Sequence, residues 1–299
     1  IIFTSGTTGE PKGVMLTHDN FLIQLDELKE RIPLEVGDKA LCVLPVWHAF
    51  QRLCEYVIIC QACAICYSKP VGSILLADFQ KLNPQIMPAV PRVFEAVYDG
   101  ILRTMRKTGG IVYALFNFFT AIALLHSKID RKLFRKSARF KKNDHIVLYW
   151  ILLVLPWLLL YPLKMLGGAI VFKKIRAKLG NSFKTGVSGG GALPPAIDAF
   201  FWAVGVKIIE GYGLTETAPV ISVRPMNKPI YGTVGAPIRG VEARIVDDNG
   251  NVLPQGQKGV VQVRGGTVMK GYYKRDDLTA KVMHGDWFDT GDIGILTVN

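Results

Sequence analysis

The spacing of apolar residues predicts alternating helices and strands over the first hundred residues of the chain. Apolar side chains recur at helical spacing between residues 21 and 32, and Thr17 precedes them as a candidate N-cap. Short apolar runs at residues 1–3 and 40–44 predict strands, the first being the end of a buried strand. Because helical and strand-like stretches alternate to about residue 105, the pattern is typical of an α/β fold with a parallel sheet.

Residues 111–172 interrupt this alternation with an apolar insert. Residues 111–125 are apolar apart from two polar side chains, and residues 146–163 carry no charge, although Pro156 and Pro162 lie within them. A run of 18 uncharged residues is a marginal candidate for a transmembrane helix.

After residue 178 the α/β pattern resumes, and from Gly232 onward it becomes the pattern of a β-rich region. Residues 241–247 and 259–264 alternate apolar and polar side chains, and Asp-Asn-Gly at residues 248–250 predicts a turn after the first of these strands. The elements expected before this region are a strand near 184–187, a helix near 196–204 and a strand near 207–209.

The composition is that of a folded protein with a large core. The chain has 299 residues, of which 49% are hydrophobic and 20% charged, and its mean hydropathy is +0.26. These values exclude a disordered chain, a collagen-like chain and a small disulfide scaffold.

The net charge of +12 is concentrated in one segment. Residues 128–178 hold 13 Lys or Arg and two acidic residues, whereas the other 248 residues hold 23 basic and 22 acidic groups. A fold that binds nucleic acid would not usually concentrate its charge beside the most apolar parts of the chain, so we expect no nucleic-acid partner.

Five cysteines lie between residues 42 and 66, and no signal peptide is evident, which favours a reduced intracellular setting. Cys60, Cys63 and Cys66 have the spacing of half an iron–sulfur motif. The next ligand of that motif would fall on Pro70, so we expect buried thiols rather than a metal site.

Three motifs carry candidate chemistry. Residues 4–13, Thr-Ser-Gly-Thr-Thr-Gly-Glu-Pro-Lys-Gly, combine glycines, hydroxyls and a lysine, as a loop that cradles phosphate requires. Residues 211–217, Gly-Tyr-Gly-Leu-Thr-Glu-Thr, place an aromatic ring that can stack on a purine before oxygen ligands suited to Mg²⁺. Residues 286–292, Asp-Trp-Phe-Asp-Thr-Gly-Asp, end on a carboxylate that can accept bonds from two ribose hydroxyls. Taken singly, each could instead be a flexible polar turn, a strand-to-loop junction or a surface acidic turn.

The order and spacing of these motifs closely resemble those of the adenylate-forming superfamily and, within it, the long-chain fatty acyl-CoA synthetases. Residues 45–48, 90–95, 188–193 and 232–237 also match this family, and the resemblance covers the chain outside residues 111–172. It implies an α/β large domain with parallel or mixed sheets flanked by helices, running into a small β-rich subdomain. Family members also have an N-terminal region and a C-terminal cap domain, and we expect both to be absent from this segment.

The resemblance implies ATP-dependent formation of an acyl-adenylate from a long-chain fatty acid, with Mg²⁺, followed by thioester formation with coenzyme A. Ser5, Thr7, Thr8 and Lys12 would hold the β- and γ-phosphates, Thr215 would contact the α-phosphate, and Glu216 would bind Mg²⁺. Tyr212 would stack on adenine against Gly190 and Gly191, Asp292 would bind the ribose, and His48 would line the carboxylate pocket. The candidate catalytic residues are therefore Thr215, Glu216, His48 and Lys12, and the candidate ATP-binding residues are Ser5, Gly6, Thr7, Thr8, Gly9, Lys12, Gly190, Gly191, Gly211, Tyr212, Gly213, Thr215 and Asp292.

Two alternatives remain for the function. An acyl-[acyl carrier protein] synthetase performs the same adenylation with an acyl carrier protein as the thiol acceptor. A catalytically inactive, membrane-bound protein that binds ATP or acyl-adenylate is the alternative from another class.

The four predicted segments are an α/β nucleotide-binding core at residues 1–110, a membrane-associating insert at 111–178, a second core segment at 179–231 and a β-rich subdomain at 232–299. The phosphate loop and the adenine motif must share one site, and a single membrane crossing would separate them. A hairpin of two crossings would carry eight basic residues of loop 126–145 across the bilayer, against the positive-inside rule.

We therefore expect a cytoplasmic protein with a monotopic insert on an anionic membrane surface, rather than a helical insertion buried in the core. Such an insert could pass a lipid-dissolved fatty acid to the acyl site.

Overall fold

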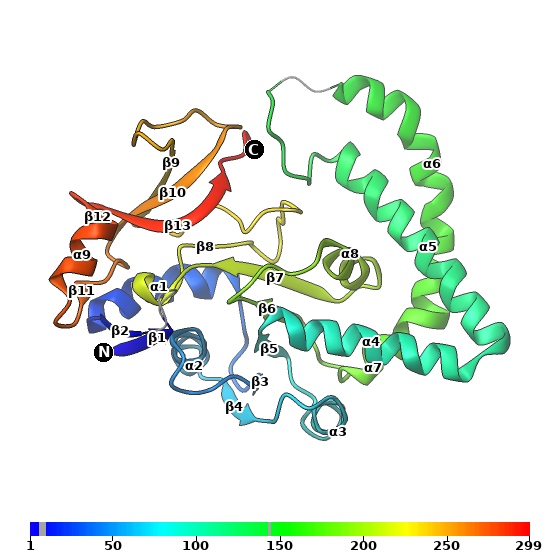
Figure 1. Cartoon of the computed structure of the whole chain (residues 1–299). Helices are drawn as coiled ribbons and strands as arrows, with labels where there is room; N and C mark the ends of the chain where they lie inside the picture. The colour runs from blue at the N-terminus through cyan, green and yellow to red at the C-terminus, as the bar shows by residue number, and fades with distance from the viewer. Residues whose placement is uncertain (6–9, 143–144) are drawn as a thin grey trace.

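The structure is a computed structural model that describes residues 1–5, 10–142 and 145–299, without the side chains of Ser5 and Ser73. In this part of the chain a six-stranded sheet forms the centre, in the order β4-β3-β5-β6-β7-β8 (Figure 1). Five strands are parallel and β8 pairs antiparallel with β7, which confirms the expected α/β class. The strands are β3 (Lys39–Cys42), β4 (Ala64–Tyr67), β5 (Ile86–Ala89), β6 (Thr185–Ser188), β7 (Lys207–Tyr212) and β8 (Ser222–Val223).

Alternate residues of the strands face opposite sides of this sheet and join different cores. On β3, Leu41 belongs to a core with helices α3 (Gly72–Leu82), α4 (Pro91–Thr108), α5 (Gly110–Leu133), α7 (Lys173–Lys178) and α8 (Pro195–Ala203). Ala40 and Cys42 face the other side, where α2 (Ala49–Cys60) and the end of α1 (His18–Arg31) cover the sheet. The two sets of helices therefore cover opposite faces.

Helix α1 begins where the sequence predicts it. The Thr17 hydroxyl accepts a hydrogen bond from the backbone N–H of Asn20 at 3.2 Å, and the Asn20 side chain accepts one from the N–H of Thr17 at 2.8 Å. These reciprocal bonds satisfy two N–H groups that the helix itself cannot pair.

A small antiparallel sheet joins the start of the chain to residues 271–272, in the order β1-β2-β11: β1 (Ile2–Ser5), β2 (Pro11–Met15) and β11 (Gly271–Tyr272). Ile1 and Phe3 are 61% and 67% exposed, so the expectation of a buried strand at residues 1–3 is wrong. The reason is that β1 pairs with β2 at the edge of this sheet, and no helix among the described residues covers these side chains.

The β-rich region forms a four-stranded antiparallel sheet beside helix α9 (Asp276–Val282). Its strands are β12 (Met283–His284), β13 (Trp287–Ile295), β10 (Lys258–Gly265) and β9 (Val241–Val246), in that order.

Residues 110–172 form a helical hairpin that lies over α8 and α4 (Figure 1). The hairpin consists of α5, the connecting segment, α6 (Ile146–Gly167) and the π-helical turn η1 (Gly168–Phe172). Helix α6 continues through both of its prolines and follows a curved path in Figure 1. Both helices are long and apolar enough to cross a membrane by length and composition alone, which is weak evidence of a span.

The two helices of the hairpin are buried to very different extents. Phe116, Phe119 and Ala123 of α5 are buried in the core that includes α8. In α6, Gly167 alone is buried, and large apolar side chains such as Ile151 and Leu159 are 68% and 64% exposed.

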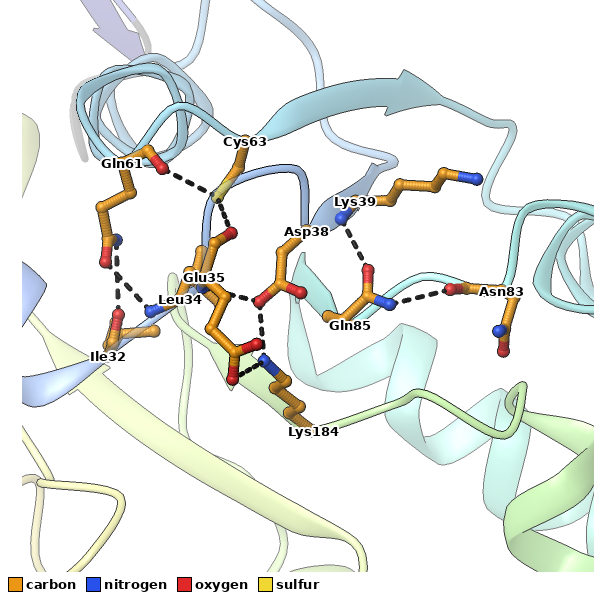
Figure 2. Close-up of polar contacts among 10 residues, drawn as sticks. All are labelled: Ile32, Leu34, Glu35, Asp38, Lys39, Gln61, Cys63, Asn83, Gln85 and Lys184. Carbon is orange, nitrogen blue, oxygen red and sulfur yellow. Dashed lines mark hydrogen bonds and ion pairs between the residues drawn. The ribbon is translucent and has the colours of Figure 1, made fainter.

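Polar contacts gather at the edge of the sheet where the parallel strands begin (Figure 2). Lys184, just before β6, forms ion pairs with Asp38 at 2.8 Å and with Glu35 at 3.0 Å, and the Asp38 contact raises the pKa of Lys184. In the same cluster the Gln85 side chain accepts a bond from the backbone N–H of Lys39. This cluster ties the starts of three strands together, at the edge opposite the predicted motifs.

The five cysteines differ in burial: Cys42 is buried, Cys60 is exposed and the other three are partly buried. Cys63 lies in this polar cluster, where its thiol donates to the Glu35 carbonyl oxygen at 3.2 Å, whereas Cys60 at the end of α2 is exposed. The expectation of a buried thiol is therefore wrong for Cys60, because α2 ends with this side chain directed to solvent. Within the described residues, no three His, Cys, Asp or Glu side chains gather as a metal site.

Candidate functional site

Four of the motifs follow the carboxyl ends of adjacent strands. Residues 45–48 follow β3, residues 90–95 follow β5, residues 189–193 follow β6, and residues 211–217 end β7. Loops at this edge of a parallel sheet lie side by side and form the usual ligand-binding crevice of α/β proteins. The sheet order therefore places motifs that are up to 170 residues apart at one crevice.

Tyr212 and Asp292 bring the adenine motif and the ribose motif together. The Tyr212 hydroxyl donates a hydrogen bond to Oδ2 of Asp292 at 2.8 Å. Burial raises the pKa of the Tyr212 hydroxyl, so the phenol is neutral and acts as the donor. The partially enclosed ring of Tyr212 and the exposed Asp292 carboxylate thus lie on one wall of the crevice.

Gly213 is required by a close chain crossing. A Cβ atom at this position would lie 1.7 Å from the carbonyl oxygen of Pro219. Only glycine allows this approach, which turns the chain from β7 into the 3-10 turn η2 (Thr215–Thr217). The turn holds Thr215 and Glu216 beside Tyr212.

Glu216 and Lys12 meet through a tyrosine that the motifs did not include. The Tyr272 hydroxyl donates to Oε1 of Glu216 at 2.8 Å, and Nζ of Lys12 lies 5.1 Å from the centroid of the Tyr272 ring. Because β11 pairs with β2, residues 271–272 lie beside the phosphate-loop hairpin. No charge or spacing in the sequence marks Tyr272, since its place depends on a strand pairing across more than 250 residues.

Residues 6–9 of the phosphate loop lie outside the described residues. Gly6, Thr7, Thr8 and Gly9 have no described position, and Ser5 is described only as the last residue of β1. Their proposed phosphate contacts stay predictions.

An apolar cavity of about 80 Å³ lies beneath the crevice. Its walls are apolar side chains of α1 and α2, including Leu28, Leu53 and Ile58, and the β-strand residues Ile86 and Val187. At the crevice end it is lined by His48, Gly189, Gly190, Gly211, Tyr212, Gly213, Leu214 and Thr215. Gly191, the second glycine expected to support adenine, is exposed and does not line this cavity.

His48 lies at the mouth of this cavity as the N-cap of α2. Its Nδ1 accepts a hydrogen bond from the backbone N–H of Phe50 at 3.1 Å, which places the proton of the neutral ring on Nε2. Partial desolvation at the cavity mouth lowers the pKa of the imidazole.

No described residue of the hairpin lines this apolar cavity. The cavity lies on the α1/α2 face of the sheet, whereas the hairpin packs on the other face. The expectation that the insert passes a fatty acid to the acyl site stays a prediction.

A second, larger cavity of about 990 Å³ opens beside the first. Tyr212 lines both cavities. The second is also lined by Asp292, by Ile230 and residues 232–237 of the loop after β8, and by Phe140 of the hairpin. It is roomy enough for a nucleotide, with the adenine and ribose motifs on one wall.

Glu210 is a further site residue that the motif search missed. Its Oε1 accepts a bond from the backbone N–H of Leu193 at 3.0 Å, and its Oε2 is bound by Arg224 at 3.0 Å. Burial raises the pKa of Glu210. The carboxylate holds the glycine loop after β6 against β7. In the sequence, Glu210 directly precedes Gly211 of the adenine motif, and this is the pattern that could have identified it.

The residues at the crevice fit Mg²⁺ held together with a nucleotide. Glu216 offers a carboxylate and Thr215 a hydroxyl, both hard oxygen donors. Mg²⁺ commonly binds through one or two carboxylates and substrate phosphates, so a protein cage of several acidic groups is not required.

The chain is similar to known proteins over nearly its whole length. The AMP-binding enzyme family matches residues 1–273. From Arabidopsis thaliana, the chain is similar to probable acyl-activating enzyme 16, chloroplastic, with 42% identity over 99% of this chain and 42% of the relative. It is 40% identical to long-chain-fatty-acid–[acyl-carrier-protein] ligase AEE15, chloroplastic, covering 98% and 41% of the two chains. Long chain acyl-CoA synthetase 3 is 32% identical over 98% of this chain and 42% of that protein.

Among solved structures, ATP-bound MatB from Rhodopseudomonas palustris shares the fold, with a TM-score of 0.68 and 21% identity over 100% of this chain and 46% of that chain. The chain spans less than half the length of these relatives. The family match covers most of the chain and includes the crevice residues up to Tyr272. The chain therefore belongs to the AMP-binding, adenylate-forming enzymes, and within them its sequence is similar to long-chain fatty acid ligases.

Proposed function

We propose that the protein to which this chain belongs activates a long-chain fatty acid with ATP and transfers the acyl group to a thiol. The observation that carries the proposal is the Tyr212–Asp292 hydrogen bond, which unites the adenine and ribose motifs on one wall of a nucleotide-sized cavity. The apolar cavity that shares Tyr212 supplies a site for the first part of an acyl chain.

In the first step, the fatty acid carboxylate attacks the α-phosphorus of ATP and pyrophosphate leaves. In the second, the thiol attacks the carbonyl carbon of the acyl-adenylate and AMP leaves. The first step needs charge neutralisation and alignment more than a protein nucleophile. Lys12 would neutralise phosphate charge and the Thr215 hydroxyl would orient the α-phosphate. Mg²⁺, held by Glu216, would neutralise charge on the leaving pyrophosphate.

The acyl cavity must enlarge when a long chain binds. A volume of about 80 Å³ holds only a few methylene groups, so side chains of α1 and α2 would have to move. His48 at its mouth would face the carboxylate end of the acid.

Pyrophosphate exchange tests the adenylation step in the full-length protein. We expect ATP–pyrophosphate exchange that depends on a long-chain acid and falls at least about 100-fold in Glu216→Gln. The matched control is Tyr272→Phe, which removes a hydrogen bond to the Glu216 carboxylate and keeps the carboxylate itself. It should reduce the exchange rate far less than Glu216→Gln. Absence of exchange in the wild type, with AMP still bound, would support the inactive binding protein instead.

The thiol acceptor has two candidates. Coenzyme A is the expected acceptor, whereas the identity of 40% with a protein named as an acyl-carrier-protein ligase, against 32% with a coenzyme A synthetase, favours an acyl carrier protein. Thioester formation measured with each thiol at equal concentration, after the same adenylation step, decides between them.

We also propose that α6 lies in the surface of an anionic membrane. Val147, Ile151, Leu155 and Leu159 recur at helical spacing, and each is 61–69% exposed. Exposed lysines flank this stripe at both ends, at residues 141–142 and 173–174. Helix α6 is apolar on most sides, and what fits the membrane surface is its exposed apolar side together with the cationic ends, whose lysines reach the headgroups.

Burial of α5 opposes a crossing of the bilayer by the hairpin. Phe116, Phe119 and Ala123 pack in the protein core, so carrying α5 into lipid would expose that core to the bilayer and open the fold. Helix α6 alone, 22 residues long, would leave its two ends on opposite sides of the membrane, although both connect to one folded body.

Vesicle binding tests this surface. Replacing Ile151 and Leu159 by Ser should release most of the full-length protein from anionic vesicles, because about 25 cal/mol is lost per Å² of apolar area no longer buried. Lys141→Glu with Lys142→Glu should weaken binding in low salt, whereas Lys39→Glu with Lys81→Glu, an equal charge change far from the hairpin, should not. Unchanged binding of the Ser variant would contradict the proposal.

The chloroplastic names of two relatives favour a plastid membrane over the expected cytoplasmic setting. The position of a fluorescent fusion of the full-length protein in the cell tests this.

A further inference from the structure

The last turns of α5 contact the loop that lines the nucleotide cavity. The guanidinium carbon of Arg131 lies 3.5 Å from the centroid of the Tyr231 ring, which is a close stacked geometry. Tyr231 directly precedes residues 232–237, which line the larger cavity. Burial raises the pKa of Tyr231 to about 12, so the ring is neutral.

Backbone hydrogen bonds fasten the same loop to the hairpin. The N–H of Tyr231 donates to the Lys136 carbonyl oxygen at 2.6 Å, and the N–H of Ala138 donates to the Tyr231 carbonyl oxygen at 3.0 Å. Phe140, two residues further along, lines the cavity itself. The hairpin thus provides part of the wall of the nucleotide site.

Tyr231 also adjoins a buried arginine. The guanidinium carbon of Arg224 is 5.9 Å from the Tyr231 ring centroid, and the side chain is fully buried. Arg224 donates to both oxygens of Asp198, at 3.0 and 3.1 Å, and to Oε2 of Glu210 at 3.0 Å. The other oxygen of Glu210 holds Leu193 at the end of the glycine loop.

These contacts form a continuous path from the hairpin to the adenine site. It runs from Arg131 to the Tyr231 ring, then to Arg224, to Glu210 and to the glycine loop at Leu193. Glu210 also precedes Gly211 and Tyr212 directly, so a shift of its carboxylate would move both sides of the adenine site.

Arg131 is poorly explained as a stabilising residue. Its Nε and one terminal nitrogen are buried without a hydrogen-bond partner, and the neighbouring Asp130 forms its ion pair with Lys136 instead. Leaving charged donors unsatisfied costs free energy, which offsets the gain from the cation–π contact with Tyr231. A buried polar group of this kind calls for another explanation.

We infer that Arg131 is a positioning residue through which the hairpin sets the geometry of the adenine site. The inference rests on the proposed function, because it assigns nucleotide binding to the crevice. Arg131 itself does not contact the nucleotide; it fixes Tyr231 and the loop of residues 231–237 against Arg224.

Kinetics of the full-length protein with a short soluble acid, without lipid, test the inference. Arg131→Met should raise KM for ATP about 3- to 10-fold, with kcat within about twofold and KM for the acid unchanged. Arg131→Lys should not restore KM, since an ammonium cannot stack in plane on the ring. Arg103→Met, which removes an exposed arginine from α4, is the matched control and should match the wild type.

Variants of the ring separate positioning from general loss of structure. Tyr231→Phe keeps the ring and should retain a KM near that of the wild type, whereas Tyr231→Leu should resemble Arg131→Met. If the two residues act through one contact, the double variant Arg131→Met/Tyr231→Leu should be no worse than either single variant. A fall in kcat together with equal rises in KM for ATP and in KM for the acid, and with a lower Tm, would overturn the positioning role.

Direct binding of AMP distinguishes failure of this inference from failure of the proposed function. Calorimetry on the same variants should show weaker AMP binding in Arg131→Met than in Arg103→Met, whether or not the protein exchanges pyrophosphate. Equal AMP affinity in these two variants would overturn the inference, even if adenylation is confirmed.

Discussion

At the scale of single residues, two substitutions of Tyr212 separate the contribution of its hydrogen bond to Asp292 from the contribution of its ring. Tyr212→Phe removes the hydroxyl and keeps the ring, so it should raise KM for ATP only about 2- to 5-fold, the effect of one net hydrogen bond. Tyr212→Ala also removes a stacking surface worth about 1 kcal/mol and should bind ATP clearly more weakly. Titrations with AMP and steady-state kinetics measure both, and equal losses from the two variants would assign the effect to the hydroxyl alone.

His48 gives a prediction about pH. Its folded-state pKa is lowered by partial desolvation, so the ring is neutral at pH 7 and its Nδ1 can accept the Phe50 N–H bond. The stability that this cap contributes is present above the unfolded pKa of about 6.5 and is lost as pH falls through the lower folded value.

The prediction can be measured with His48→Ala. This variant should lose about 1 kcal/mol of unfolding free energy at pH 7.5, the usual value of an N-cap, and much less at pH 5. Urea denaturation at the two pH values checks this. A loss that stays the same at both would mean that the ring does not act through the Phe50 bond.

The residues that the sequence did not reveal share one property. Glu216 and Asp292 could be proposed because each lies in a short motif, whereas Tyr272 and Arg224 act through partners 56 and 14 or more residues away. A tyrosine or an arginine outside a motif has no local pattern that distinguishes a hydrogen bond to a candidate site carboxylate from ordinary burial. Such residues become visible only when the strand pairing is known.

At the scale of elements, the two helices of the hairpin touch at Gly167. A Cβ atom there would lie 2.8–2.9 Å from three carbon atoms of Phe119 on α5, whereas a Cβ on Gly168 would meet nothing within 4 Å. The close approach lets α6 lie directly against α5.

Alanine at these neighbouring glycines should therefore have opposite effects. Gly167→Ala should cost roughly 1–3 kcal/mol by overpacking and loosen the hairpin, whereas Gly168→Ala should be neutral or slightly stabilising. Hydrogen exchange should show lost protection in residues 111–166 of the first variant and unchanged protection in β3, β5 and β6. Loss of protection throughout the sheet would mean that the hairpin and the core unfold together.

Local patterns predicted elements well where both ends and the buried face are encoded in neighbouring residues, as in α1 with its Thr17 cap. Local patterns failed where contacts with distant parts of the chain decide whether a helix is buried. Residues 111–125 and 146–163 are similarly apolar, yet the first stretch lies against α8 and the second is largely exposed. Periodicity cannot distinguish these outcomes, because both helices are apolar on most sides. Likewise, nothing local indicates that residues 271–272 pair with β2.

At the scale of the whole molecule, charge and apolar surface coincide on one side. The basic segment at residues 128–178 contains most of the excess charge, and α6 carries the largest run of exposed apolar side chains. The order of the motifs was enough to predict the fold class, but not the face of the sheet on which this insert would pack. The insert packs on this face because α5 contacts α4 and α8, which lie there.

Because the hairpin and the acyl cavity lie on opposite faces of the six-stranded sheet, the acid and the proposed lipid contact are separated by the body of the protein. On the proposed function, an acid molecule in the leaflet under α6 would have to desorb and re-enter from solution. The initial rate should then depend on the aqueous concentration of monomeric acid and not on its mole fraction in the lipid. Adding inert lipid at a constant concentration of free acid should therefore leave the initial rate unchanged. A rate that instead followed the mole fraction of acid in the vesicles would indicate an entry route along the protein surface. On the proposed function the membrane would retain the enzyme near a reservoir of acid, and desorption of the acid would limit its supply.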